Sequence, residues 1–175
     1  MNDKIGILLV NLGTPDSPSV KDVRKYLKEF LNDDRVIDLS WLKRKLLVNL
    51  IIVPLRAPKS AKEYVKLFNL FDGESPLLKN GLILKEKLQA KMTKNYTVEL
   101  AMRYGNPSMD SVLEKMRNDN YDKIVVFPLY PHYAASSMGT VIEKTNKIIN
   151  KWWNIPEVVT MGQFYNNPDF IKAFA

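Results

Sequence analysis

The stretch that decides the fold is residues 5–10, IGILLV, an uninterrupted apolar run followed at once by Asn11-Leu12-Gly13-Thr14-Pro15. Residues 98–102, 124–129 and 158–161 repeat this arrangement of apolar run, polar loop and helical pattern. Strands that alternate with helices form a parallel sheet, and continuous apolar runs are typical of strands covered on both faces. The sequence therefore predicts an α/β fold with a four-stranded parallel sheet flanked by helices.

The loops after these runs are rich in Asn, Arg, Tyr, His and Gln. They are residues 11–15, 103–107, 130–133 and 163–168. Parallel sheets bind ligands beyond the carboxyl ends of their strands, so we expect these side chains to gather along one edge.

Three of the helices are predicted to begin with a capping residue and a proline. The pairs are Ser17-Pro18, Asn106-Pro107 and Asn167-Pro168. A polar side chain caps the free amides of the first turn, and proline lacks an amide that the first turn would leave unpaired.

About 90 residues separate the first two predicted strands, far more than one crossover helix needs. Residues 42–53, 61–71 and 82–92 have helical patterns, and Pro54, the 72–76 turn and Asn80-Gly81 are predicted to separate them. Long insertions of this kind are often functional. The segment from Leu42 to Val53 is apolar on all sides, which indicates that it is buried, lines an apolar mouth or dips into a membrane face.

Composition excludes several classes of function. The chain has 175 residues, a net charge of +7 and no cysteine, so disulfides, thiolate metal sites and an iron–sulfur cluster held by this chain are excluded. No apolar run reaches the about 20 residues of a membrane span, and the first residues lack a targeting pattern, so a cytoplasmic protein is expected. Scattered lysines without a recognition motif argue against nucleic acid as a partner.

The candidate functional residues indicate ligand binding rather than catalysis or metal coordination. His132 is the single histidine and has no ligand-spaced carboxylates beside it, so no metal site and no catalytic residue are predicted. Arginines and tyrosines near turns, beside many apolar groups, are what a large flat apolar ligand with carboxylates at its edge would require. The chain ends at Ala175, early in a helical pattern, so we expect a missing second lobe.

Five segments, in order, resemble the N-terminal half of the ferrochelatase family. They are residues 8–18 (LLVNLGTPDSP), 30–38 (FLNDDRVID), 56–64 with 73–77 (RAPKSAKEY and GESPL), 101–107 (AMRYGNP) and 128–139 (PLYPHYAASSMG). The resemblance implies that residues 1–175 are one lobe of the three-layer chelatase fold, with its helical insertion after the first strand. It also implies an enzyme of haem synthesis that inserts Fe²⁺ into protoporphyrin IX, with porphyrin and the C-terminal lobe as partners.

The resemblance also implies roles for particular residues. The positions that match porphyrin-binding positions of the family are Asn11, Leu12, Arg56, Tyr64, Ser75, Arg103, Tyr104, Tyr130 and Ser136. The segment from Leu42 to Val53 matches the lip of the porphyrin entrance, which in turn suggests a peripheral contact with the inner membrane. The family's catalytic histidine and glutamate would lie beyond Ala175, so this chain alone is expected to be inactive.

Three positions depart informatively from the family pattern. His132 stands where glutamine is common, so it is not the catalytic histidine. Leu12 stands where relatives that use coproporphyrin carry tyrosine, which favours protoporphyrin. Ala135 stands where some members have an iron–sulfur cysteine, so no cluster is expected. A porphyrin- or haem-binding module without catalysis, and an α/β scaffold that binds a small anion, remain alternatives.

Overall fold

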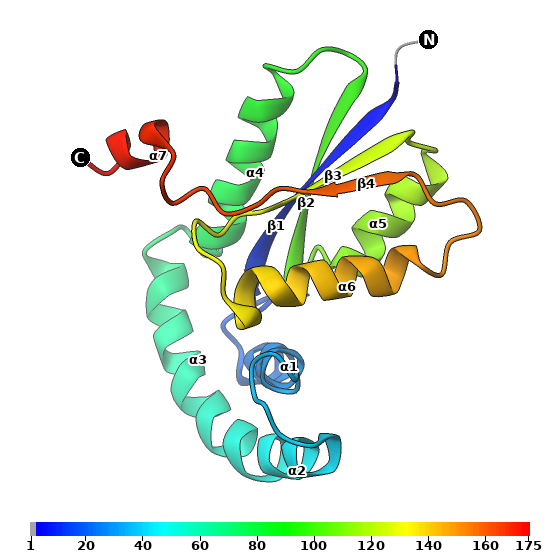
Figure 1. The fold of residues 1–175 in the computed structure, drawn as a ribbon. Helices are drawn as coiled ribbons and strands as arrows, with labels where there is room; N and C mark the ends of the chain where they lie inside the picture. The colour runs from blue at the N-terminus through cyan, green and yellow to red at the C-terminus, as the bar shows by residue number, and fades with distance from the viewer. Residues whose placement is uncertain (1–2) are drawn as a thin grey trace.

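The computed structural model describes residues 3–175 and contains a four-stranded parallel sheet in the order β2-β1-β3-β4 (Figure 1). Met1 and Asn2 lie outside the described residues. They belong to the first residues of the chain, in which the sequence pattern predicts no targeting segment. The strands are β1 (Ile5–Thr14), β2 (Tyr96–Gly105), β3 (Lys123–Pro128) and β4 (Glu157–Thr160). The predicted fold class and all four predicted strands are confirmed.

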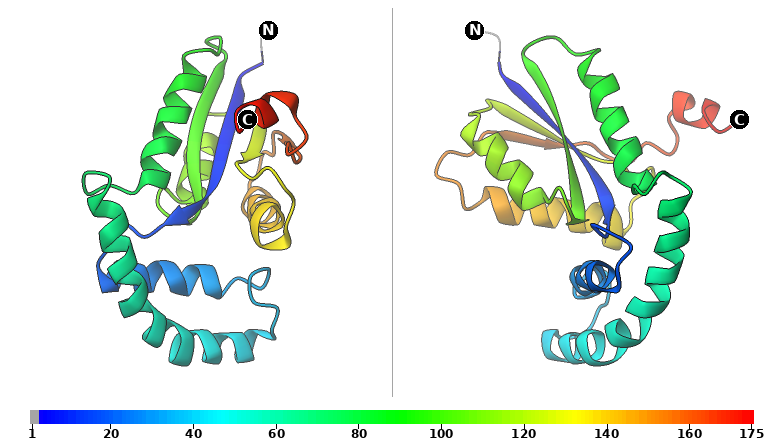
Figure 2. Two further views of the ribbon diagram at one scale, coloured as in Figure 1. Left: turned by 90° about the vertical axis from the view of Figure 1, so that its left-hand side faces the viewer. Right: turned by 180° about the vertical axis from the view of Figure 1, so that it is seen from behind.

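Helices cover the sheet unequally. Those of the insertion between β1 and β2 are α1 (Val20–Leu31), α2 (Trp41–Leu46), the π-helical η1 (Leu47–Ile52), α3 (Val53–Asn69) and α4 (Pro76–Gln89). Those after β2 are α5 (Met109–Asn118), the π-helical η2 (Ala135–Gly139), α6 (Thr140–Ile149) and α7 (Pro168–Lys172). α1, α2 and α3 lie beyond the carboxyl edge of the sheet, whereas α7 stands off from the sheet (Figure 2).

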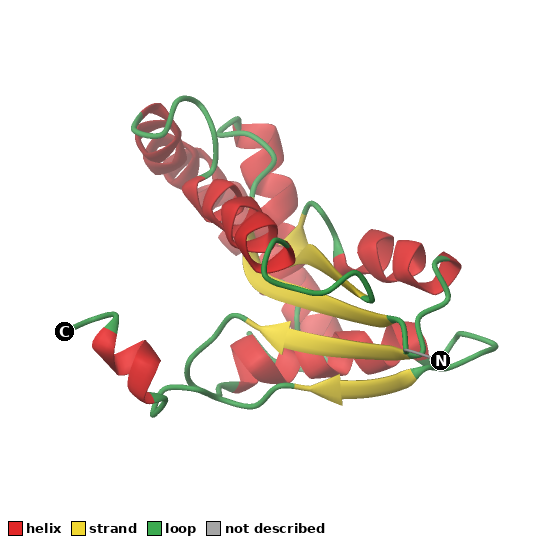
Figure 3. Ribbon diagram, turned by 90° about the horizontal axis from the view of Figure 1, so that it is seen from above, coloured by secondary structure: helices red, strands yellow, loops and turns green. Residues whose placement is uncertain are grey.

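The core lies on both faces of the sheet, which makes three layers (Figure 3). One cluster packs α5 and α6 against β1 and β3 and includes Leu8, Leu113 and Ile124. Another packs α4 against Leu9 and Leu100 on the opposite face. Each central strand therefore sends alternate side chains into a different layer, as expected of a sheet covered on both faces.

Only one of the three predicted cap-and-proline starts is confirmed. Asn167 caps α7, its Oδ1 accepting from the amide of Asp169 at 2.9 Å. The Ser17-Pro18 prediction is wrong, because Ser19 caps α1 and the Ser17 hydroxyl is 2.5 Å from the Asp22 carboxylate.

The Asn106-Pro107 prediction is wrong as well. Ser108 caps α5, and Asn106 instead donates its side-chain amide to Asp16 of the β1–α1 loop at 2.8 Å. The Asn106 side chain, which the local pattern assigned to a helix cap, therefore forms a tertiary hydrogen bond with Asp16 instead.

Pro54 does not separate two helices, because α2, η1 and α3 run continuously from Trp41 to Asn69. Pro54 is the second residue of α3, with one residue between it and the π-helical turn that ends at Ile52, so the amide that proline lacks falls next to the change from π-helical to α-helical hydrogen bonding. Pro58 lies inside α3, where Figure 1 shows the helix curving.

The predicted break at Asn80-Gly81 is also wrong. Ser75 caps α4, Pro76 is its first residue, and Gly81 lies inside the helix. A Cβ on Gly81 would lie 2.9 Å from Cδ2 of Leu100, closer than side-chain atoms approach. Gly81 therefore allows α4 to pack closely on β2 rather than ending a helix.

The segment from Leu42 to Val53 is mostly exposed, which contradicts the interpretation that it is buried. Within it only Arg44, Val48 and Val53 are buried. Its exposed apolar side chains, and their immediate neighbours, are Trp41, Leu42, Leu46, Leu50, Ile51 and Leu55. None of the helices formed by residues 3–175 has both the length and the apolar character needed to cross a membrane.

Glu99 of the edge strand β2 clamps helices on opposite faces of the sheet. Its carboxylate is 2.7 Å from Lys85 of α4 and 2.5 Å from Lys115 of α5, and the residue is 7% exposed. Burial alone would raise the pKa of Glu99, but the hydrogen bonds and charges of the two lysines outweigh it, so the pKa lies below its ordinary value.

Replacing this carboxylate should weaken the fold and flatten its pH dependence. A group with a depressed folded-state pKa contributes stability above its unfolded pKa and loses it as pH falls through the folded value. We expect Glu99→Gln to lower the free energy of unfolding by about 1–2 kcal/mol at pH 7, with a smaller loss near pH 3. Urea unfolding at both pH values measures this, and Glu114→Gln, at an exposed ion pair of α5, is the control. Equal losses at the two pH values would contradict the clamp.

Candidate functional site

The carboxyl ends of three neighbouring strands bring together residues predicted for the site. Asn11 of β1 lies opposite Met102 of β2, and Gly13 lies opposite Tyr104. Gly13 has φ +115°, and a Cβ there would overlap the Tyr104 carbonyl oxygen, so only glycine fits. The amide of Leu129 donates to Val10 at 2.8 Å, which places Tyr130 at the same edge. The predicted gathering of strand-end loops is therefore observed for β1, β2 and β3.

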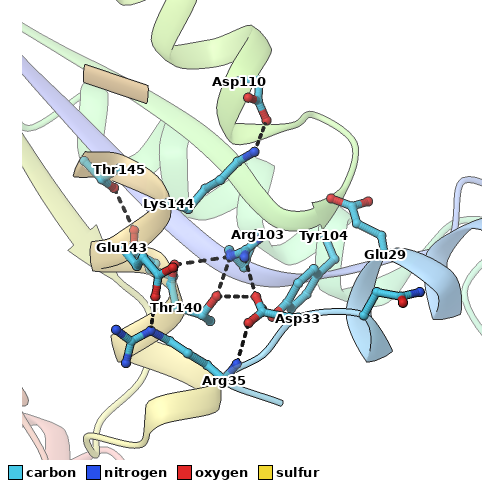
Figure 4. A network of polar contacts seen from close by, with 12 residues as sticks. Glu29, Asp33, Arg35, Arg103, Tyr104, Asp110, Thr140, Glu143, Lys144 and Thr145 are labelled. Carbon is cyan, nitrogen blue, oxygen red and sulfur yellow. Dashed lines mark hydrogen bonds and ion pairs between the residues drawn. The ribbon is translucent and has the colours of Figure 1, made fainter. Parts of the chain in front are cut away.

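A buried polar cluster around Asp33 occupies this edge (Figure 4). Oδ2 of Asp33 accepts from the Tyr104 hydroxyl at 2.8 Å and from the Thr140 hydroxyl at 2.6 Å, and it forms an ion pair with Arg103. Its other oxygen accepts from the backbone amide of Arg35 at 2.8 Å. The Arg103 Nε donates to the Thr140 hydroxyl at 2.8 Å. We call Asp33, Arg103, Tyr104 and Thr140 the Asp33 cluster.

The Asp33 cluster holds its charges in their ionised forms. Burial alone would raise the pKa of Asp33, but the hydrogen bonds from Thr140, Tyr104 and Arg35 and the charge of Arg103 lower it below its ordinary value. Burial raises the pKa of the Tyr104 phenol far above its ordinary value, so this hydroxyl remains a donor. At neutral pH the cluster therefore contains an ionised carboxylate that is paired with the Arg103 guanidinium.

Arg103 and Tyr104 are turned inward in this arrangement. Tyr104 has no exposed surface, and the Arg103 side chain is only 12% exposed. The guanidinium also lies over the Tyr104 ring, 4.4 Å from its centroid. Their polar groups are therefore engaged within the chain, where they hold the strand-end edge in place.

A second grouping is apolar and aromatic. Leu12, Tyr64 and Tyr104 belong to one cluster beneath the carboxyl edge, with α1 and α3 as its other walls. Tyr64 packs edge-on against Tyr26, with ring centroids 6.3 Å apart. Burial raises the pKa of Tyr64, which keeps its phenol neutral. Leu12, Tyr64 and Tyr104, three of the nine predicted site residues, thus belong to one packed cluster of side chains.

Tyr130 is partly buried against the core of β1, β3 and α6. Its hydroxyl is buried and has no hydrogen-bond partner among residues 3–175. Burial raises the pKa of Tyr130, although the charge of Arg103 opposes this. Tyr130 therefore has a buried, unpaired hydroxyl near the charge of Arg103, and native structures rarely leave such a group without a partner.

The remaining predicted residues are dispersed. Asn11 accepts the amide of Leu12 through its own side chain at 2.8 Å. Arg56 is exposed on α3, and Ser136 is exposed in η2. Ser75 is buried as the cap of α4. The structure does not bring all nine residues around one cavity.

His132 makes an aromatic contact in the structure and does not lie in a group of metal-ligating side chains among residues 3–175. The His132 ring stacks on Tyr165, with centroids 4.9 Å apart, in an exposed loop. Within residues 3–175 no three His, Cys, Asp or Glu side chains converge in a way that would hold a metal ion. Histidine here packs as an aromatic ring.

Sequence reasoning missed Asp33 and Thr140. Asp33 lies in the 30–38 segment that carried the resemblance, but nothing in that segment distinguishes it from Asp34. Its partners Arg103 and Thr140 are 70 and 107 residues away along the chain. A buried ion pair of this separation has no local signal, so only the tertiary structure identifies it.

Neutralising Asp33 should destabilise the chain strongly, because it leaves the Arg103 charge buried without its partner. We expect Asp33→Asn to lower the free energy of unfolding by about 3 kcal/mol. The neighbouring exposed residue provides the matched control, since Asp34→Asn should change stability by no more than about 0.5 kcal/mol. Urea unfolding followed by circular dichroism measures both. Equal losses in the two variants would contradict a stabilising ion pair between Asp33 and Arg103.

Comparisons with known proteins agree with this architecture. The family model described as Ferrochelatase matches residues 4–175. A protein named Ferrochelatase from Chromobacterium violaceum is 42% identical over 176 residues, which cover 98% of this chain and 48% of that protein.

Two further relatives give the same result. Ferrochelatase 2 from Shewanella oneidensis is 42% identical, over 97% of this chain and 52% of its own length. Ferrochelatase from Francisella tularensis subsp. tularensis is 39% identical, over 99% of this chain and 52% of its own length. The chain thus spans about half the length of these curated relatives. By the match of nearly its whole length to the family model, this chain belongs to the ferrochelatase family.

Proposed function

We propose that this chain is the porphyrin-binding half of a ferrochelatase, the enzyme that inserts Fe²⁺ into protoporphyrin IX to form haem. The observation that carries the proposal is the strand-end edge, where the partly buried Leu12 and Tyr64 pack over buried Tyr104, which also belongs to the charged Asp33 cluster. A flat apolar macrocycle with acidic substituents needs such a wall with few, well-placed polar groups.

The proposed roles follow from exposure and charge. Leu12 and Tyr64 contact the apolar face of the macrocycle, and Asn11 lies beside them. Exposed Arg56 attracts a propionate, while Ser75, Tyr130 and Ser136 offer hydroxyl groups. Arg103 and Tyr104 hold the edge in place through Asp33. Leucine at position 12 leaves the wall apolar, which suits protoporphyrin better than the more carboxylated coproporphyrin.

Metal insertion requires a base that removes the pyrrole protons, within hydrogen-bond reach of the ring centre. The residues proposed to contact porphyrin here are neutral or cationic, so we assign proton removal and iron delivery to the other half of the protein. In a chain that binds porphyrin without that half, the macrocycle would be held but not metallated.

Protoporphyrin binding to this chain tests the proposal. Absorbance titration of protoporphyrin IX should show saturable binding, and added Fe²⁺ or Zn²⁺ under anaerobic conditions should give no metalloporphyrin above the uncatalysed rate. Arg56→Ala should weaken binding about two- to fivefold, since a solvent-exposed ion pair is worth about 0.5–1 kcal/mol. Lys59→Ala, which removes another exposed cation of α3, is the control.

Each result has a separate meaning in this titration. Failure to bind protoporphyrin would contradict the proposed site, whereas metal insertion by the chain alone would contradict the assignment of catalysis to the other half. Saturable binding in a full-length protein that cannot insert metal would favour the alternative, a binding module without catalysis.

The segment from Leu42 to Val53 is proposed as the lip of the porphyrin entrance and as a contact with the surface of the inner membrane on its cytoplasmic side. Its support is the row of exposed apolar side chains beside exposed Lys43 and Lys45. Buried Arg44 donates to the backbone carbonyls of Asn32 and Leu39, at 2.9 and 2.6 Å, and so fastens this segment to α1. Apolar groups flanked by lysines favour the interface of an anionic bilayer.

Vesicle binding tests the lip. The chain should co-sediment with vesicles that contain anionic phosphatidylglycerol, and Leu50→Asp/Ile51→Asp should reduce the bound fraction at least fivefold, because two charges replace inserted apolar groups. Leu70→Asp, which changes an apolar side chain that is 78% exposed at the end of α3, should have little effect. Equal loss in both variants would contradict a localised contact.

A further inference from the structure

A cavity of about 540 Å³ lies between α4 and the loops that follow β1 and β2. Its walls come from the β1–α1 loop, the end of α3, α4 and the β2–α5 loop. The apolar part of its lining consists of Pro15, Phe68, Leu78, Leu82, Ile83 and Pro107. Of the residues proposed to bind porphyrin it includes only Ser75, so it is a different surface from the cluster of Leu12, Tyr64 and Tyr104.

The walls of this cavity are fixed by hydrogen bonds. The amide of Gly73 donates to the Phe68 carbonyl at 2.9 Å and closes the end of α3. The Pro107 carbonyl accepts from Met102 at 2.7 Å, which ties the β2–α5 loop to its strand. Asp16 accepts the Asn106 side-chain amide at 2.8 Å and joins the two strand-end loops. A ligand would therefore meet a preformed cavity and would order little of the protein on binding.

The charge of the cavity is opposite to that of the chain. Three carboxylates line it, from Asp16, Glu74 and Glu86, against the single ammonium of Lys79. Lys79 pairs with Glu74 at 3.3 Å, and Lys25, which lies outside the lining, pairs with Asp16 at 3.0 Å. Glu86 is thus the lining carboxylate for which residues 3–175 provide no ion pair. The lining therefore carries two more negative charges than positive ones, in a chain whose net charge is +7. An acidic rim around an apolar floor attracts cations that have an apolar body.

We propose that this cavity binds a hydrophobic amine, with its aromatic or aliphatic body against Phe68, Leu82 and Ile83 and its ammonium at the carboxylate of Glu86. The volume is that of a drug-sized ligand site. The same acidic rim disfavours carboxylates and therefore a porphyrin with propionates. The inference is independent of the proposed function, because it concerns a ligand of opposite charge and a set of contacts that shares only Ser75 with the proposed porphyrin site.

A matched pair of fluorescent probes tests the charge preference. Dansylcadaverine ends in an ammonium, and dansyl-6-aminohexanoate has a similar body that ends in a carboxylate. Fluorescence titration of the 175-residue chain at 0.15 M salt should show at least tenfold tighter binding of the amine. Glu86→Lys should weaken amine binding at least fivefold and should not weaken carboxylate binding.

Two leucines of α4 test the location. Leu82 and Leu84 are both 42% exposed, but only Leu82 lines the cavity. Leu82→Arg should abolish amine binding, while Leu84→Arg should change it less than twofold and both should retain the native circular dichroism spectrum. Equal affinity for the two probes, no amine binding, or equal losses in the two leucine variants would overturn the proposal. Protoporphyrin titration of Leu82→Arg reports separately on the proposed function.

Discussion

The ion pair between Asp33 and Arg103 is the interaction on which the functional edge depends. Asp33 follows α1, in the insertion, whereas Arg103 lies on β2 and Thr140 begins α6. One carboxylate thus joins three parts of the chain that share no local contacts. The ion pair and the hydrogen bonds to Asp33 keep the two opposite charges stable in a largely buried place, and removing one charge would leave the other without its partner.

This cluster also divides the edge into an inner and an outer set of side chains. Arg103 and Tyr104 direct their polar groups into the protein, and close contact between β1 and β2, permitted by Gly13, leaves no room for a ligand between them. Leu12, which is partly buried and apolar, and the buried, unpaired hydroxyl of Tyr130 lie outside these polar contacts. A rigid charged frame beneath an apolar surface is a suitable support for a large flat ligand, since the frame loses no conformational freedom on binding.

The charge of the chain is unevenly distributed, and the distribution matters more than the total. Lysines flank the exposed apolar segment of α2 and η1, whereas carboxylates surround the apolar cavity beside α4. Both surfaces are apolar at the centre, and they differ in the sign of the charges around them. A net charge of +7 alone would have indicated only anionic partners.

The sequence by itself determined the four strands and their parallel pairing, because these depend on apolar runs that alternate with helical patterns along the chain. It did not determine where helices begin and end in the insertion. Pro54 does not end a helix, because it lies just after a π-helical turn, and Gly81 does not end α4, because it allows close packing on the side chain of Leu100. The resemblance named Arg103 and Tyr104 but not their partner. Only the tertiary structure could decide that, because the fold brings Asp33 to them across 70 residues, and the energy of a buried ion pair depends on position in space rather than on order in the chain.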